Sequence, residues 1–247
     1  TGESPNLTKE DRKIIYSTAK DSVGDKAKII AGTGTYSTRE SIEYTKMAND
    51  IGVDGIMIVT PYYSKPSQFG ILQHFEQISK NTDLPIMAYN IPGRTATLIE
   101  IETLEKLVDD IGIHSIKDAV GDLEFSKTEL DALKEKVDIY SGNDAETIEF
   151  MKLGGKGVVS VASHIVGNEI YDLINHVLDD EIETADNMQN QLLPLFDLLF
   201  QEPSPGPVKY LLTHTWEDVG APLMPITDIS GDLANKLLDN FQKIKNN

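Results

Sequence analysis

The sequence contains no cysteine, which excludes disulfides, thiolate metal sites and cysteine nucleophiles. Long hydrophobic runs are also missing. The longest apolar stretches, such as residues 55–60, are far shorter than the roughly 20 residues of a membrane-spanning helix. The first residues carry no charged leader of the kind that opens a signal peptide. We therefore expect a cytoplasmic protein that has no membrane partner.

Positive charge is scarce. The chain has 22 Lys and Arg residues against 40 Asp and Glu residues, which gives a formal net charge of −18. Such a charge repels nucleic acid, because nucleic-acid binding needs clustered basic side chains that neutralise phosphates. Nucleic acid is therefore not an expected partner, and any small anionic substrate must be held by local cations and backbone N–H groups.

Histidine is too sparse to predict a metal site. The five histidines are scattered, with no pair at i and i+4 and no carboxylate cluster beside them: His74, His114, His164, His176 and His214. Adjacent carboxylates such as Asp109 and Asp110 lie in polar turns or on helix faces and are interpreted as solvated charge. We expect no metal ion.

What the sequence does contain is a regular alternation of short β-rich runs and longer amphipathic runs. Six strands are predicted, over residues 27–32, 55–60, 85–90, 112–117, 137–141 and 157–161. A helix is predicted before them, over residues 9–19, and further helices between them, over residues 37–51, 68–80, 99–108, 125–134 and 147–153. Most of the strands are nearly continuous apolar runs, which is typical of parallel strands covered on both faces.

After Gly167 the pattern predicts helices alone, over residues 169–177, 182–200, 208–214 and 233–244. We therefore expect two regions, a βα region over residues 1–166 and a C-terminal helical extension over residues 167–247. The βα region is predicted to be a TIM-type (β/α)8 barrel that lacks its first two strands, because a closed barrel needs eight strands and the chain offers six. The alternative is an open, doubly wound six-stranded sheet, although Gly32-Thr33-Gly34 lacks the third glycine of a phosphate-binding loop.

Lys117 ends one of the apolar strands. At the C-terminal rim of a barrel its amine would enter a partly dry cavity, where desolvation favours the neutral, nucleophilic form. On the strand alone, the more frequent outcome is a lysine that extends its ammonium into solvent.

Tyr89 and Arg94 lie at the end of another strand and on the loop after it. A phenol at the rim can relay protons, and an arginine can bind a carboxylate with two hydrogen bonds. Taken singly, Tyr89 is more often a core tyrosine and Arg94 a solvated arginine. Tyr62 and Tyr63 follow a third strand, and adjacent aromatics on an exposed loop indicate a ligand or a partner surface.

In combination, these motifs resemble the dihydrodipicolinate synthase family, within the wider group that includes N-acetylneuraminate lyase. The resemblance extends from Thr1 to about Thr227. It rests on seven motifs in order: Thr1-Gly2-Glu3-Ser4, Ala31-Gly32-Thr33-Gly34, Thr60-Pro61-Tyr62-Tyr63, Tyr89-Asn90-Ile91-Pro92-Gly93-Arg94-Thr95, Ile116-Lys117-Asp118-Ala119, Tyr140-Ser141-Gly142-Asn143-Asp144 and Pro205-Gly206-Pro207-Val208-Lys209.

The resemblance implies a lyase of lysine and diaminopimelate biosynthesis, in which Lys117 forms a Schiff base with pyruvate and the resulting enamine attacks L-aspartate 4-semialdehyde. Tyr89 then shuttles protons, and Tyr63 completes the relay across a subunit interface, so a homo-oligomer, a tetramer or a dimer, is expected. Arg94 holds the semialdehyde carboxylate. No cofactor is needed, because the lysine iminium is itself the electron sink.

The same resemblance makes Gly142 and Val159 backbone positions of the pocket and Thr1 a ligand of the pyruvate carboxylate. The family has a second threonine before Thr1, which supplies a further hydroxyl of the relay and does not occur in this sequence. Two alternatives stay open. One is another pyruvate-dependent aldolase that acts on sialic acid or keto-deoxy sugar acids, although the sialic acid lyases lack the arginine found here in Pro92-Gly93-Arg94. The other is an inactive barrel fragment that acts only in assembly.

Overall fold

A computed structural model describes residues 2–246, which form two compact units. One of them, the βα unit, comprises residues 7–142 and 153–156. The helical unit comprises the N-terminal residues up to Asn6, residues 143–152 and the chain from Gly157 onward. The boundary expected between residues 166 and 167 was drawn from the order of strands and helices and stays a prediction.

The βα unit is built on one five-stranded sheet with every neighbouring pair parallel, which confirms the predicted parallel α/β arrangement. Its strands are β1(Ile30–Gly32), β2(Gly55–Val59), β3(Ile86–Asn90), β4(Ser115–Asp118) and β5(Asp138–Ser141). They lie in sequence order, β1-β2-β3-β4-β5, so each strand pairs with the next one along the chain.

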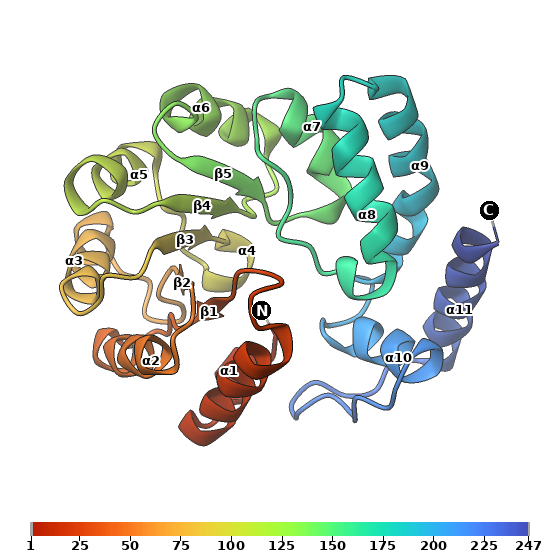
Figure 1. The fold of residues 1–247 in the computed structure, drawn as a ribbon, viewed down its shortest axis with the longest axis horizontal. Helices are drawn as coiled ribbons and strands as arrows, with labels where there is room; N and C mark the ends of the chain where they lie inside the picture. Colours follow the sequence, from red (N-terminus) through yellow and green to blue (C-terminus); the bar gives the residue numbers. More distant parts are fainter. Residues whose placement is uncertain (1, 247) are drawn as a thin grey trace. The chain divides into compact units, whose positions relative to one another are not determined.

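This order argues against the doubly wound alternative. A doubly wound sheet reverses its strand order at a switch point and carries helices on both faces. Here the order does not reverse, and right-handed connections taken always in one direction leave their helices on one face. Figure 1 shows α2, α3, α5 and α6 on the same side of the strands. That arrangement is the one found in a βα barrel.

The strand predicted over residues 157–161 is wrong. Among the described residues of that segment only Val158 makes an isolated bridge. The amides of Val161 and Ala162 donate instead to the Asp144 carboxylate, at 3.1 Å each, and therefore do not pair with a neighbouring strand. A continuous apolar run alone could not reveal that side-chain acceptor.

The four longest helices of the βα unit begin where short polar side chains cap them, whereas α4, α5 and η2 have no side-chain cap. They are α1(Lys9–Val23), α2(Thr38–Ile51), α3(Gln68–Ser79), α4(Pro92–Thr95), α5(Ile101–Lys106), the π-helical turn η2(Leu107–Ile111) and α6(Leu123–Leu133). Thr8 and Asp11 form a reciprocal capping box at the start of α1, while Ser37, Ser67 and Asp122 cap α2, α3 and α6. The single turn α4 was not predicted.

The helical unit has its own apolar core. It contains η1(Ser4–Asn6), η3(Asp144–Glu146), α7(Thr147–Lys152), α8(Ser163–Leu178), α9(Ile182–Leu198), α10(Gly206–Thr215) and α11(Gly231–Lys245). Leu173, Leu195, Leu211 and Leu237 lie fully buried in one cluster that joins α8, α9, α10 and α11. These four helices confirm the predicted helical pattern of the C-terminal region, with boundaries shifted by a few residues.

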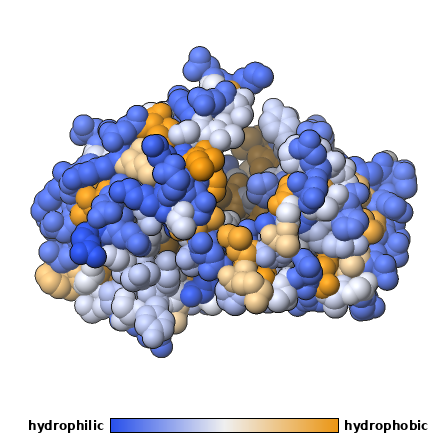
Figure 2. All heavy atoms as spheres, turned by 90° about the horizontal axis from the view of Figure 1, so that it is seen from below, coloured by the Kyte–Doolittle hydropathy of each residue, from blue (hydrophilic) through white to orange (hydrophobic). Residues whose placement is uncertain are grey.

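Among the described residues no helix is long and apolar enough to cross a membrane. The face shown in Figure 2 is mostly hydrophilic, with apolar residues in separate patches.

Gly34 fixes how closely the segment after β1 approaches β2. The amides of Thr33 and Gly34 both donate to the Met57 carbonyl, at 3.1 and 3.3 Å. A Cβ on Gly34 would lie 2.5 Å from the backbone nitrogen of Val59 and 2.9 Å from Cα of Ile58. Both of those atoms belong to strand backbone, so the side chain of any other residue would push β1 and β2 apart.

We expect Gly34→Ala to lower the free energy of unfolding by about 1–3 kcal/mol, the usual cost of an added group in a packed interior. Urea unfolding measures this change. Gly167→Ala is the control, because nothing lies within 4 Å of the Cβ it would add. Equal stability of the two variants would show that the sheet yields at Gly34 without cost.

Candidate active site

The centre of the candidate site is the pairing of β3 with β4. Tyr89 and Lys117 are register partners on these neighbouring parallel strands. The side-chain amine of Lys117 lies over the Tyr89 ring, with Nζ 4.2 Å from the ring centroid. Each residue is only 5% exposed. The structure thus brings together two residues that the sequence analysis had singled out separately.

This geometry differs from that of a strand-end lysine whose ammonium reaches solvent. An amine over an aromatic face is attracted by the ring electrons, and the attraction grows as water is excluded. The ring also restricts where the amine can lie, so an electrophile has a defined direction of approach. A buried amine beside a phenol is an arrangement suited to covalent catalysis with local proton transfer.

Gly142 follows β5 and lies directly against Lys117. Its amide donates to the Asp118 carbonyl at 2.5 Å. A Cβ at this position would lie 2.6 Å from Cβ of Ala119 and 2.9 Å from Cε of Lys117. The absence of a side chain therefore leaves room for the lysine stem, which is a physical reason for glycine at a position first selected by resemblance.

Two buried polar side chains hold the strand ends around Tyr89. Asn90 exchanges hydrogen bonds with the backbone of Ile99, at 3.0 Å in both directions, and so closes the loop that follows β3. Thr60 donates its hydroxyl to the Tyr89 carbonyl at 3.1 Å. Arg94 lies on α4 within the closed loop, where its side chain is exposed. It is therefore free to meet a ligand.

Tyr63 lies on the surface of the βα unit, whereas Lys117 is buried. Tyr63 is 93% exposed and has a left-handed backbone with φ of +67°, uncommon for a residue with a side chain. Its neighbour Tyr62 packs edge-on against Tyr36, with ring centroids 5.6 Å apart. The loop thus directs one phenol onto the protein and presents the other to solvent.

The other predicted site residues lie outside the βα unit. Val159 belongs to the helical unit, where it is half-buried and next to the backbone held by Asp144, and Thr1 lies outside the described residues. Within the helical unit, Lys209 donates to the Glu3 carboxylate at 3.1 Å. Two motifs from opposite ends of the sequence, Gly2-Glu3-Ser4 and Pro207-Val208-Lys209, therefore meet in that unit.

The sequence analysis did not find one polar cluster, which lies next to Lys117. Asp118, Ser126 and Glu129 are all buried between β4 and α6. The signal was present in the helix, because Glu129 has the spacing of the buried stripe to which Ser126, Leu130 and Leu133 belong. A glutamate inside such a stripe is unusual enough to be singled out.

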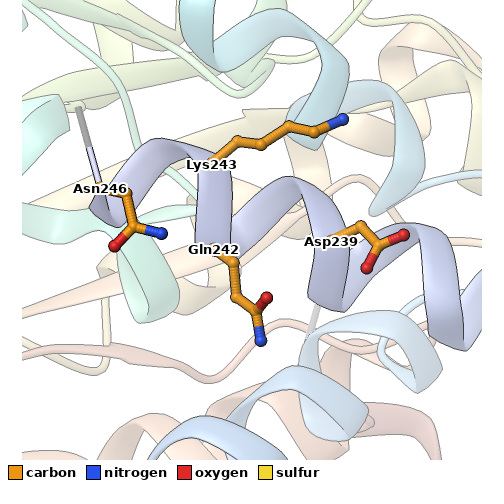
Figure 3. A pocket seen from close by; sticks show the side chains of 4 residues that line it. All are labelled: Asp239, Gln242, Lys243 and Asn246. Carbon is orange, nitrogen blue, oxygen red and sulfur yellow. The ribbon is translucent and has the colours of Figure 1, made fainter.

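Among residues 2–246, no group of three His, Asp or Glu side chains is placed to hold a metal ion. A hollow beside α11 is lined by Asp239, Gln242 and Lys243 of that helix and by Asn246, which follows its last residue (Figure 3). Charges of both signs on a single helix face are typical of a solvated surface and do not form a convergent site.

Comparison with known proteins decides the relationship. The family model described as the Dihydrodipicolinate synthetase family matches residues 1–244. The chain belongs to this family. The 4-hydroxy-tetrahydrodipicolinate synthase 1 of Halalkalibacterium halodurans is 44% identical over 230 residues, which cover 92% of this chain and 78% of that protein. The 4-hydroxy-tetrahydrodipicolinate synthase of Bacillus subtilis is 42% identical over 232 residues, which cover 92% and 80%.

Solved structures of the dihydrodipicolinate synthetase family have the same fold. The 4-hydroxy-tetrahydrodipicolinate synthase of Methylacidiphilum fumariolicum SolV superposes with a TM-score of 0.96 at 36% identity, over 99% of this chain and 82% of that one. A dihydrodipicolinate synthase of Bacillus anthracis superposes with a TM-score of 0.93 at 39% identity, over 98% and 82%. The family predicted from the motifs is thereby confirmed.

We expect Gly142→Ala to displace the Lys117 stem and to lower the free energy of unfolding by about 1–3 kcal/mol, because the added Cβ overlaps Cε. Urea unfolding measures the change. Gly93→Ala is the control within the same unit, since open space surrounds its Cβ. Unfolding of Gly142→Ala at the wild-type midpoint would contradict the close approach.

Proposed function

We propose that this protein is a lyase that condenses pyruvate with L-aspartate 4-semialdehyde to give 4-hydroxy-tetrahydrodipicolinate, with Lys117 as the nucleophile. The observation that carries the proposal is the buried amine of Lys117 over the Tyr89 ring, in a chain that belongs to the dihydrodipicolinate synthetase family. The names of its relatives, 4-hydroxy-tetrahydrodipicolinate synthases, support this substrate pair over a sugar acid.

In the first step the neutral amine of Lys117 attacks the ketone carbon of pyruvate. A carbon–nitrogen bond forms, and the ketone oxygen leaves as water after it has received two protons. The product is an iminium, whose positive nitrogen withdraws electrons from the neighbouring methyl group. Loss of a methyl proton then gives an enamine. No cofactor is required, because the iminium nitrogen accepts the electron pair.

Tyr89 is the proposed proton carrier in these steps. Its ring lies under the amine of Lys117, so its hydroxyl is carried by the same strand pair that positions the nucleophile. A phenol with an ordinary pKa near 10 works as an acid or as part of a hydrogen-bonded chain. We assign it the delivery of protons to the departing oxygen and their recovery from the methyl group.

Arg94 is the proposed ligand of the semialdehyde carboxylate. Its planar guanidinium can donate two parallel hydrogen bonds to a carboxylate, and its exposed position on α4 leaves it accessible. The enamine carbon then attacks the aldehyde carbon of the bound semialdehyde, whose oxygen takes a proton and becomes the hydroxyl group of the product. The amino group of the semialdehyde then adds to the iminium carbon, and the carbon–nitrogen bond to Lys117 breaks, which closes the ring and frees the lysine. Gly142, Val159 and Thr1 are proposed as the pocket positions around the pyruvate-derived group.

Tyr63 is proposed to complete the proton relay of a second copy of the chain. Its exposure of 93% and its left-handed backbone support a phenol presented outward and used across a subunit interface. The protein would then act as a homo-oligomer, a tetramer or a dimer. The five strands are proposed to be consecutive strands of a TIM-type (β/α)8 barrel.

The nucleophile can be tested by incubating the protein with pyruvate and sodium borohydride and measuring its intact mass, followed by peptide mapping. We expect one stable adduct, on Lys117, and none in Lys117→Ala, which should retain its fold and lose turnover. Lys127→Ala, which removes an exposed lysine of α6, is the control and should form the adduct normally. An adduct on Lys117→Ala would refute the assignment.

Arg94→Ala should lower kcat/KM for the semialdehyde about 10- to 100-fold, because a hydrogen bond to a charged group contributes about 1.5–3 kcal/mol. The pyruvate adduct on Lys117 should form at the wild-type rate. Steady-state kinetics with varied semialdehyde, compared with Arg39→Ala, an exposed arginine of α2, measures the effect. If adduct formation fell as much as semialdehyde use, the assigned role would be wrong.

A further inference from the structure

The strand that carries Lys117 carries an acid immediately after it. Successive side chains of a strand point to opposite faces, so Lys117 and Asp118 face away from each other. Asp118 faces α6. It accepts a hydrogen bond from the Ser126 hydroxyl at 2.5 Å and another from the amide of Val120 at 2.8 Å, and it is only 3% exposed.

A second acid lies against the first. Glu129, one turn beyond Ser126 on α6, is fully buried. In the described part of the chain neither of its carboxyl oxygens has a hydrogen-bond partner of ordinary geometry. The carboxyl of Asp118 nevertheless acts on it, both through its charge and as a hydrogen-bonding neighbour. An ionised carboxylate without donors, beside another carboxylate, is costly in a dry interior.

We propose that Glu129 is a positioning residue for Lys117: it shares one proton with Asp118, and this shared proton holds the C-terminal end of β4 against α6. The inference rests on the proposed function in so far as it concerns Lys117. The proton-sharing pair itself requires no assumption about the reaction.

The partners of each acid decide which of them carries the proton. Asp118 has two donors, Ser126 and Val120, and hydrogen bonds to a carboxylate favour its ionised form. Glu129 has no donor, so it is the member that stays protonated and donates to Asp118. Burial and the neighbouring Asp118 charge raise the pKa of Glu129 well above its ordinary value. Burial also raises the pKa of Asp118, against the lowering effect of its hydrogen bonds.

The charged surroundings of the pair favour a retained proton. Asp122, at the start of α6, adds a further negative charge that raises the pKa of Asp118. On β5, the register partner of Asp118 is Ser141, which is not titratable. On β3 the register partner is Asn90, and α5 buries Thr103 and Leu104. These neighbours supply no countercharge, so loss of the shared proton would leave repelling carboxylates behind β4.

The effect on Lys117 follows from the backbone. Asn90, Asp118 and Ser141 are consecutive register partners across β3, β4 and β5. If Asp118 shifted away from α6, β4 would move with it, and so would Lys117, the residue before Asp118 on that strand. The amine then leaves its position over the Tyr89 ring, because that position depends on the same register. The proton held on one face of β4 therefore sets the geometry on the other face.

The direction of the pH effect can be derived from linkage. An acid whose pKa is raised in the folded state binds its proton more tightly there than in the unfolded chain. The stability that this proton contributes is fully present below the unfolded pKa of glutamate, about 4.3. It decreases as the pH rises from that value through the raised folded pKa. The pair therefore opposes folding progressively on the alkaline side.

The first experiment compares urea unfolding of wild type, Glu129→Gln and Glu124→Gln from about pH 5 to about pH 9. Glutamine keeps a donor for Asp118 and cannot lose a proton. We expect the folding constant of Glu129→Gln, relative to wild type, to increase with pH, approaching tenfold per pH unit between the two pKa values. Glu124→Gln changes an exposed glutamate of the same helix and should stay parallel to wild type. Parallel profiles for wild type and Glu129→Gln would overturn the shared proton.

Asp118→Asn is the second variant, because it removes the neighbouring charge and must weaken the same pH dependence, while burial of Glu129 still raises its pKa. The positioning role is read from the rate of the borohydride-trapped pyruvate adduct on folded protein. As the pH rises and the pair loses its proton, we expect this rate in wild type to fall relative to the rate in Glu129→Gln. Equal pH profiles of the adduct rate, with different unfolding profiles, would overturn the positioning role. Absence of any adduct in wild type would refute the proposed function, while the unfolding experiment would still decide the pair.

Discussion

The parallel register between β3 and β4 is the constraint on which the candidate site depends. It sets Tyr89 opposite Lys117, and the adjoining register sets Asn90 opposite Asp118. A slip of one residue would turn the lysine to the helix side and the aspartate to the other side. The fully buried apolar side chains of β2, β3 and β4, Ile58, Ala88 and Ile116, resist such a slip because they would have to leave the core. The packing of these apolar side chains therefore holds Tyr89 and Lys117 in the arrangement on which the chemistry of the site depends.

Most polar groups near the site support backbone and do not react. Thr60 and Asn90 are fully buried, and each is bonded to a main-chain group at the C-terminal end of the sheet. Buried polar side chains must find partners, and Asn90 finds them in the N–H and C=O groups of Ile99, in the loop after β3. Gly142 adds to this support, because without a Cβ its backbone can lie close to Lys117 and Ala119. Arg94 and Tyr63 are exposed, in contrast to the buried residues around Lys117. Exposed residues outside the strands are suited to contact with a substrate or a second subunit.

The sequence alone was sufficient for the parallel sheet, its helices and the family, because apolar runs, caps and turn residues are local signals. It also selected Lys117 and Tyr89, but only the register shows that their side chains meet. The prediction failed over residues 157–161, since the Asp144 carboxylate that takes the amides of Val161 and Ala162 lies 17 and 18 residues away in sequence. Glu129 was missed although its place in an apolar stripe was visible, because only the packing of α6 against β4, the strand that precedes it, shows that it lies beside Asp118.

The buried acids on the far side of β4 are best understood as a constraint on geometry. A leucine at position 129 would fill the same space without the desolvation of a carboxyl group, and replacing buried polar groups by apolar ones is often neutral or stabilising. Stability alone therefore does not account for a glutamate there. A hydrogen bond is directional where an apolar contact is not, so a proton shared between Asp118 and Glu129 can fix the end of β4 more narrowly than leucine packing could. Because side chains alternate along a strand, the residue fixed next to Asp118 is Lys117, whose position over Tyr89 any covalent reaction at this site requires.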